Sequence, residues 1–111
     1  MLSRLTLNRD FQQVYQRGIL VQNYYFNLYS YENGLGENRL GIIASKKIGT
    51  AVKRNRAKRL LREAYRLLEK NCRKGFDLVI SAKSTLVGKK LPEILEAVKN
   101  NLRKNQIYFN N

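Results

Sequence analysis

Residues 45–63 read SKKIGTAVKRNRAKRLLRE, and this stretch combines a break in the chain with the start of a long amphipathic helix. Residues 46–49 break the mostly apolar pattern of residues 39–45, and a helical pattern begins at Thr50 or Val52 and continues to Asn71. On a wheel of about 100° per residue, apolar and basic side chains gather on opposite sides. The apolar side carries Ala57, Leu60, Leu61, Ala64, Tyr65, Leu67 and Leu68. The basic side carries Lys58, Arg59, Arg62 and Arg66 with Asn55 among them, and Arg54 and Arg56 lie at its borders.

The charge of this helix is almost entirely of one sign. Residues 46–74 hold +10 of the formal net charge of +14, because their only acidic residues are Glu63 and Glu69. Like charges spaced i, i+4 on a helix repel by a few tenths of a kcal/mol each. A surface that serves only to solvate the helix would mix both signs and avoid this cost. Because the planar guanidinium of arginine suits phosphate oxygens and stacks on bases, the pattern indicates a nucleic-acid-binding surface.

Length and composition limit the other possibilities. The chain has 111 residues, of which 43% are hydrophobic, so it forms one domain with a single core. It contains no histidine, which excludes histidine bases and the usual zinc motifs, and its acidic residues are scattered. We therefore predict no catalytic residue and no metal ligand on this chain. A single cysteine, Cys72, and the lack of an apolar signal or membrane segment favour the cytoplasm.

The remaining elements are predicted from periodicity and turn residues. We expect a helix over 7–17, strands over 19–31, 39–45 and 76–82, a loop over 83–90, a helix with Pro92 in its first turn, and a frayed tail over 106–111.

Aromatic residues supply a second indication of nucleic-acid binding. Side chains alternate between the two faces of the predicted 19–31 strand. One face, toward the core, carries Tyr24, Phe26 and Leu28. The other, solvent-exposed face, which we call the wet face, carries Tyr25, Tyr29 and Tyr31. Phe11 and Tyr15 share one side of the first helix. A groove between that helix and the wet face would let unpaired bases stack beside the cations. Core packing is the alternative for the two helix aromatics.

The same stretch also resembles a known family. Residues 45–63 match the S-K-K-x-G-x-A-V-x-R-N-R-x-K-R-x-x-R-E signature of the bacterial ribonuclease P protein subunit. Asp10-Phe11, Phe26-x-Leu28-Tyr29 and the run from Phe76 to Val79 follow in the family's order and spacing, so the resemblance covers nearly the whole chain.

The resemblance implies a fold and a function. The fold would be a two-layer α/β sandwich, α-β-β-β-α-β-α, like the second domain of ribosomal protein S5, with a left-handed βαβ crossover through the long helix. The function would be that of a protein cofactor of ribonuclease P, whose RNA subunit, with bound Mg²⁺, removes the 5′ leader of precursor tRNA. Its partners would be that RNA and precursor tRNA, with no membrane and no small-molecule substrate.

The resemblance also implies the site residues. Arg54, Asn55, Arg56, Lys58, Arg59 and Arg62 would contact the catalytic RNA, and we add the nearby Lys46, Lys47, Lys53 and Arg66 to this RNA-binding set. Phe11, Tyr15 and Tyr29 match positions that line the leader-binding cleft.

Two alternatives from other classes stay open. The first is a ribosomal or other structural RNA-binding protein with no part in turnover. The second is a DNA-binding module, which is weaker because no helix-turn-helix or zinc spacing occurs.

Overall fold

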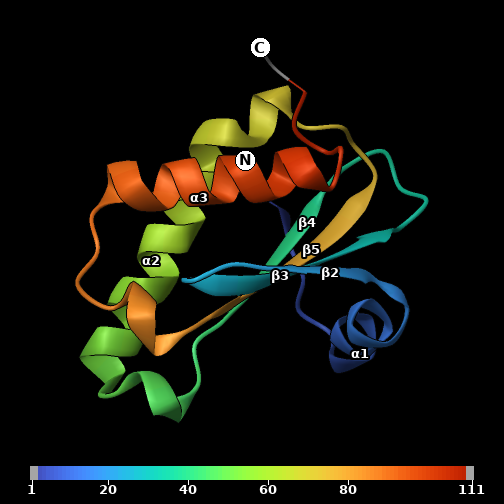
Figure 1. Cartoon of the computed structure of the whole chain (residues 1–111). Helices are drawn as coiled ribbons and strands as arrows, with labels where there is room; N and C mark the ends of the chain where they lie inside the picture. The colour runs from blue at the N-terminus through green and yellow to red at the C-terminus, as the bar shows by residue number, and fades with distance from the viewer. Residues whose placement is uncertain (1–2, 110–111) are drawn as a thin grey trace.

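The computed structural model describes residues 3–109, in which five strands form one mixed sheet flanked by three helices (Figure 1). The strands are β1 (Ser3–Arg4), β2 (Ile19–Gln22), β3 (Phe26–Glu32), β4 (Arg39–Ile43) and β5 (Phe76–Ala82), and the helices are α1 (Asn8–Arg17), α2 (Ala51–Leu68) and α3 (Leu91–Lys104). Short 3₁₀ turns occupy Lys46–Ile48, Glu69–Asn71 and Ser84–Leu86. None of the helices in this part of the chain is long and apolar enough to cross a membrane.

The strands lie in the order β1-β4-β5-β3-β2. β3 runs antiparallel to both β2 and β5, whereas β4 runs parallel to β5 and to the short β1. Parallel neighbours need a crossover connection, and α2 supplies it between β4 and β5. This arrangement confirms the expected mixed α/β fold and places the cationic helix across one face of the sheet.

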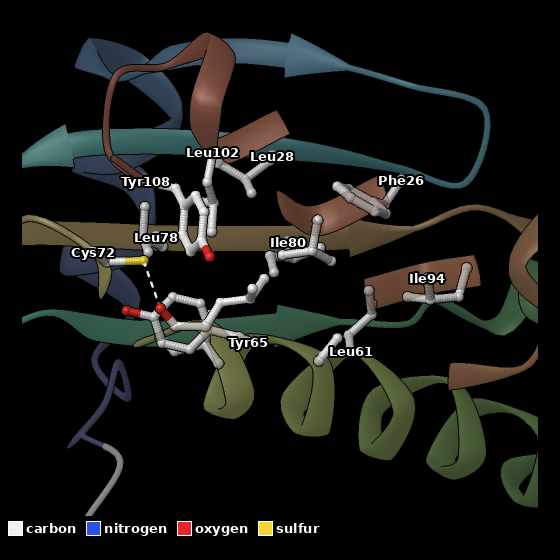
Figure 2. Close-up of a cluster of buried hydrophobic side chains, with 14 of the residues drawn as sticks. Phe26, Leu28, Leu61, Tyr65, Cys72, Leu78, Ile80, Ile94, Leu102 and Tyr108 are labelled. Carbon is white, nitrogen blue, oxygen red and sulfur yellow. Dashed lines mark hydrogen bonds between the residues drawn. The ribbon is translucent and has the colours of Figure 1, made fainter. Parts of the chain in front are cut away.

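The main core lies between the sheet and the pair α2 and α3. Leu61 and Tyr65 of α2 and Leu102 of α3 pack against Leu78 and Ile80 of β5, and all five side chains are fully buried (Figure 2). Tyr65 keeps a partner for its hydroxyl group, since Asn38 Nδ2 donates to it at 3.2 Å. The apolar side of the helical wheel is thus the buried side of α2. Leu67 is the exception, because it is 42% exposed.

Helix α1 covers part of the opposite face of the sheet (Figure 1). Its Val14 is fully buried against Val79 of β5 and Leu5, which follows β1. Gly18 ends the helix where the chain passes very close to β3. A Cβ at this position would lie 2.4 Å from the carbonyl oxygen of Val14 and 2.8 Å from that of Ser30, so only glycine fits.

The single strand expected over 19–31 is wrong, because the chain makes a hairpin there. Asn23 Oδ1 accepts hydrogen bonds from the backbone N–H groups of Tyr25 and Phe26, which turns the chain between β2 and β3. The turn also breaks the alternation before Phe26. Tyr24 is therefore 67% exposed instead of buried, and Tyr25 packs on the α2 and α3 side, where its hydroxyl donates to the Glu93 carboxylate.

The frayed tail expected from residue 106 is also wrong for the residues that the structure describes. Gln106 adopts a φ of +61°, and the chain turns back so that Ile107 and Tyr108 are buried in the main core. Tyr108 forms a β-bridge with Cys72. Residues 110–111 of the expected tail lie outside the described part.

Candidate nucleic-acid interface

The sequence before α2 explains how the basic residues come to the surface. After β4 the chain makes the 3₁₀ turn Lys46–Ile48, which buries Ile48 and exposes both lysines. Gly49 then takes a φ of +134°, a conformation that L side chains rarely adopt. Thr50 caps the helix by accepting a hydrogen bond from the Lys53 backbone N–H at 3.3 Å. Helix α2 therefore starts at a fixed point, with its basic residues facing away from the core.

We call the ten predicted RNA-binding residues the cationic surface: Lys46, Lys47, Lys53, Arg54, Asn55, Arg56, Lys58, Arg59, Arg62 and Arg66. All are exposed or half-exposed. Among them Arg66 alone forms an ion pair within residues 3–109, with Glu63 one turn earlier, and this pairing holds the pKa of the Glu63 carboxyl below its usual range. Arg54 donates to the carbonyl oxygen of Gly49 at 2.8 Å. The other charges have no acidic partner in this part of the chain and can meet phosphates.

Helical spacing divides the cationic surface into two flanks. Arg54, Lys58 and Arg62 follow one another at i, i+4 spacing on the flank toward β4, where Arg62 lines a pocket with Phe11. Lys53, Arg56 and Arg59 line a different pocket on the flank toward the loop before α3. The basic side predicted as one stripe is therefore a ridge with a hollow on each side.

The predicted rings Phe11, Tyr15 and Tyr29 lie together on the α1 side of the sheet, and we call them the aromatic surface. Tyr15 and Tyr29 meet edge to face, with their ring centroids 4.9 Å apart and their planes at 83°. Burial, with the neighbouring Tyr29, raises the pKa of the Tyr15 hydroxyl, which stays neutral at physiological pH. Phe11 is half-buried above Gly41 of β4. All three rings keep some exposed area that a base could cover.

A small pocket joins the two surfaces. It has a volume of about 200 Å³ and lies where α1, β4 and α2 meet. Phe11 lines it from α1, Arg62 lines it from α2, and Gly41 forms part of its floor. An aromatic side chain and an arginine side chain thus line the same space, and this combination suits binding of an unpaired strand. The fold thus brings together one residue predicted for the leader-binding cleft and one predicted for the RNA-binding set.

Three contributors to this region were missed in the sequence. Arg4 and Thr6 line the pocket from the segment around β1, which carries no periodic pattern. Gly41 could have been noticed, because a glycine inside an apolar strand often marks a close approach of another group. Tyr31 was expected on the wet face and does lie on the α1 side, where its hydroxyl accepts a hydrogen bond from Gln13 Nε2 at 3.0 Å.

The described residues offer few groups for acid–base or metal chemistry. No cluster of three or more His, Cys, Asp or Glu side chains occurs within residues 3–109. Cys72 is buried, which raises the pKa of its thiol to about 12, so little thiolate exists near neutral pH. Asp77 is also buried, but the Arg39 guanidinium donates two hydrogen bonds to its carboxylate, at 2.7 and 2.8 Å. The arrangement of this chain suits binding of a polyanion.

Comparison with known proteins identifies relatives of this chain. The family model described as Ribonuclease P matches residues 2–106. The ribonuclease P protein component of Caldanaerobacter subterraneus subsp. tengcongensis is 39% identical over 96% of this chain and 92% of its own length. That of Clostridium botulinum strain Langeland is 41% identical over 96% of each chain.

Solved structures show the same fold. The RNase P protein of Thermotoga maritima superposes with a TM-score of 0.84 and 34% identity, over 92% of this chain and 96% of that one. The RNase P protein of Staphylococcus aureus gives a TM-score of 0.87 and 29% identity, over 98% and 100% of the two chains. On the combined sequence and structural similarity, this chain belongs to the bacterial ribonuclease P protein family.

Proposed function

We propose that the cationic surface docks this chain on the RNA subunit of ribonuclease P. As a member of the family, the chain is the protein component of a ribonucleoprotein endonuclease that cleaves the 5′ leader from tRNA precursors. The observation that carries the docking proposal is the ridge of α2, on which the basic side chains other than that of Arg66 stand exposed or half-exposed without acidic partners among residues 3–109. Each phosphate contact on such a ridge releases counterions, which favours association at low salt.

The aromatic surface is proposed to hold the leader of precursor tRNA. Rings accept bases of any sequence because every base has a π face, and a stack contributes about 1–3 kcal/mol. The pocket between Phe11 and Arg62 supports this role, since a base on the ring would place its phosphate near the guanidinium. In this arrangement the protein positions the substrate and lowers phosphate repulsion near the scissile bond.

Magnesium is proposed to reside on the RNA and the substrate. Mg²⁺ prefers oxygen ligands and is commonly held by one or two carboxylates together with phosphates. The acidic residues of the described chain do not cluster, and the surface that would face the RNA is cationic, so phosphates are the better donors. When bound there, the ion supplies charge neutralisation and an activated water for phosphodiester hydrolysis. The side chains of this protein contribute binding and orientation.

The alternatives are less well supported. Family membership favours a part in tRNA processing over a purely structural role in another RNA particle and over DNA binding. We further propose that the protein works in the cytoplasm with its RNA partner, for which the buried, unpaired Cys72 is consistent with reducing surroundings.

A reconstitution assay tests the proposal. Adding this protein to its cognate RNA at low Mg²⁺ should restore cleavage of a precursor tRNA at the mature 5′ end, because the protein reduces the electrostatic cost of bringing two RNAs together. The rate is measured with the RNA alone, the protein alone and the mixture. An unchanged rate in the mixture would refute the function, and cleavage by the protein alone would show that the chain carries catalytic groups of its own.

A further inference from the structure

A second and larger pocket lies on the other flank of α2. It has a volume of about 550 Å³, within the range of pockets that hold small ligands, and opens between α2 and the loop that leads into α3. Neither the aromatic surface nor Arg62 contributes to it. The role proposed for the aromatic surface therefore leaves this pocket without an occupant.

The rim of this pocket is strongly cationic. Lys53, Arg56 and Arg59 line it from α2, and Lys89 and Lys90 line it from the loop. All five side chains are exposed, and none forms an ion pair within the described residues. The one acidic residue in the lining, Glu63, is already paired with Arg66. An anionic group entering the pocket would meet about five positive charges that have no competing partner.

The floor is apolar. Ala57 and Leu86 are buried there, and the half-buried Leu60, Val87 and Leu91 complete it. A phosphate alone would leave this floor uncovered, whereas a ligand with a flat, weakly polar part and an attached anion would cover the floor and meet the rim. Among polyanions, an unpaired nucleotide has this combination: its base can be splayed out of the strand and covered by aliphatic groups or an arginine plane, while its phosphates stay outside.

We propose that this pocket receives an unpaired nucleotide of the ribonuclease P RNA, with the base over Leu60 and Val87 and the flanking phosphates against Lys89, Lys90 and the α2 cations. The proposal rests on the proposed function, because it names a contact within the same RNA interface. We assign the nucleotide to the RNA subunit because the surface proposed for the leader lies on the opposite flank of α2. The contact would extend the RNA-subunit interface of the cationic surface to the flank of α2 that faces away from Phe11.

A matched pair of loop variants tests the pocket itself. Val87 lines the pocket and Ser84 does not, although both stand exposed or half-exposed in the same loop. Val87→Asp places a carboxylate where the base would lie, and Ser84→Asp makes the same charge change outside. We expect Val87→Asp to weaken binding of the RNA subunit by about 5- to 150-fold relative to Ser84→Asp, the range for losing one stacked base. Equal affinities of the two variants, each with a native melting transition, would overturn the proposal.

A second pair of variants tests the rim without changing the apolar floor, so a folding defect in Val87→Asp would not affect its result. Lys89→Ala/Lys90→Ala removes two rim charges, and Lys70→Ala/Lys74→Ala removes two exposed charges beyond the pocket. The first double variant should reduce the salt dependence of RNA-subunit binding by about two units of slope, and the second should leave it near the wild-type value. Identical slopes for both double variants would contradict a phosphate-contacting rim.

A nucleotide probe separates a base pocket from a simple anion site. The amide resonances of Val87, Gly88 and Leu91 in ¹⁵N-labelled protein are followed during titration with 5′-AMP and, separately, with inorganic phosphate at equal charge. We expect saturable shifts with 5′-AMP that exceed those with phosphate. Equal shifts with both ligands, or none with either at millimolar concentration, would reject the base pocket.

Assays of the holoenzyme show whether the bound nucleotide comes from the RNA subunit or from the precursor. They also separate failure of this inference from failure of the proposed function. In the holoenzyme assay, Val87→Asp should need about 5- to 150-fold more protein than Ser84→Asp for half-maximal cleavage of precursor tRNA, because the lost contact lies with the RNA subunit. Loss of substrate affinity with unchanged RNA-subunit affinity would overturn the assignment in favour of the precursor. If wild-type protein stimulates cleavage while Val87→Asp binds RNA like Ser84→Asp, the pocket inference fails and the function stands.

Discussion

One glycine sets the position of the ring that faces the basic ridge. Gly41 is buried in the middle of β4, and a Cβ added there would lie 2.6 Å from two atoms of the Phe11 ring and 3.3 Å from Leu5 Cβ. Real Cβ atoms do not approach a ring so closely, so any side chain at position 41 must displace Phe11. The floor of the small pocket is therefore shaped by the absence of a side chain.

This contact predicts a leader-specific defect. Gly41→Ala should push the Phe11 ring outward and weaken the affinity of the holoenzyme for precursor tRNA by about 1 kcal/mol or more, part of one stacking contribution. Affinity for the leaderless product should stay unchanged, and both are measured by equilibrium binding. Gly36→Ala is the matched control, because a Cβ at position 36 meets no atom within 4 Å. Equal behaviour of the two alanine variants would show that the ring position is irrelevant to the leader.

Removing the rings themselves gives a direct test of the aromatic surface. Phe11→Ala or Tyr29→Ala should each weaken precursor binding by about 1–3 kcal/mol and leave product binding unchanged, because only the precursor carries a leader to stack. Tyr24→Ala serves as the control, since Tyr24 is a highly exposed tyrosine in the β2–β3 turn outside this surface. If precursor and product lose affinity equally, these rings serve the packing of α1 and not the leader.

The side of the sheet on which Tyr29 and Tyr31 lie was predictable from the sequence, but the turn before their strand was not. Alternation correctly placed Tyr29 and Tyr31 opposite Phe26 and Leu28, because all four lie within one strand. It failed at Tyr24 and Tyr25, where the bond from the Asn23 side chain turns the backbone. That turn has no Asn-Gly or Pro signal, so only the folded chain reveals it.

At the scale of elements, the two sides of α2 have different roles, one in the core and one at the surface. Its apolar side, with Leu61 and Tyr65, holds the main core, and its basic side forms the ridge between the two pockets. The helix length and amphipathic pattern predicted these sides, since a period of 3.6 residues over 18 residues leaves little ambiguity. The pockets on the two flanks of the ridge depend on how α1 and the loop before α3 pack beside α2. These contacts join residues far apart in the chain, so local sequence patterns do not predict them.

The ridge predicts a measurable electrostatic signature. Arg59→Ala and Arg62→Ala should each weaken binding of the RNA subunit and lower the slope of log K against log salt by about one unit, as expected for one lost phosphate contact. Lys70→Ala, an exposed charge beyond the ridge, is the control and should leave the slope unchanged. Slopes that are the same in all three variants would show that the ridge does not meet phosphates.

The ends of the elements show what local patterns miss. The bounds of β5 match the prediction because Gly75 precedes a compact apolar run. The C-terminal turn was missed because Ile107 and Tyr108 follow a polar segment that resembles a tail. Their burial against α2 and β5 depends on a positive φ at Gln106. Glutamine rarely adopts this conformation, so the residue type does not predict the turn.

At the scale of the whole molecule, charge opposes the compact state. The formal net charge is +14, and residues 3–109 contain four ion pairs, of which only the pair of Arg39 with Asp77 has a fully buried carboxylate. Gathering one sign of charge along α2 raises the energy of the folded chain relative to an expanded one. The cationic surface therefore lowers the stability of the free protein, and an anion that occupies this surface should restore that stability.

Sulfate provides the test of this coupling. An anion that binds only the folded state stabilises it by RT ln(1 + [L]/Kd), which gives about 1.4 kcal/mol when the concentration is about ten times Kd. For a domain of this size such a gain corresponds to a rise in Tm of several degrees. We expect sodium sulfate to raise the Tm, measured by circular dichroism, more than sodium chloride at equal ionic strength, because clustered cations bind a divalent anion in addition to being screened.

Lys89→Ala/Lys90→Ala should reduce the extra rise due to sulfate, since it removes two charges from the larger pocket. If the two salts act equally on the wild-type protein, the stabilisation is screening alone and the cationic surface holds no anion in the free state.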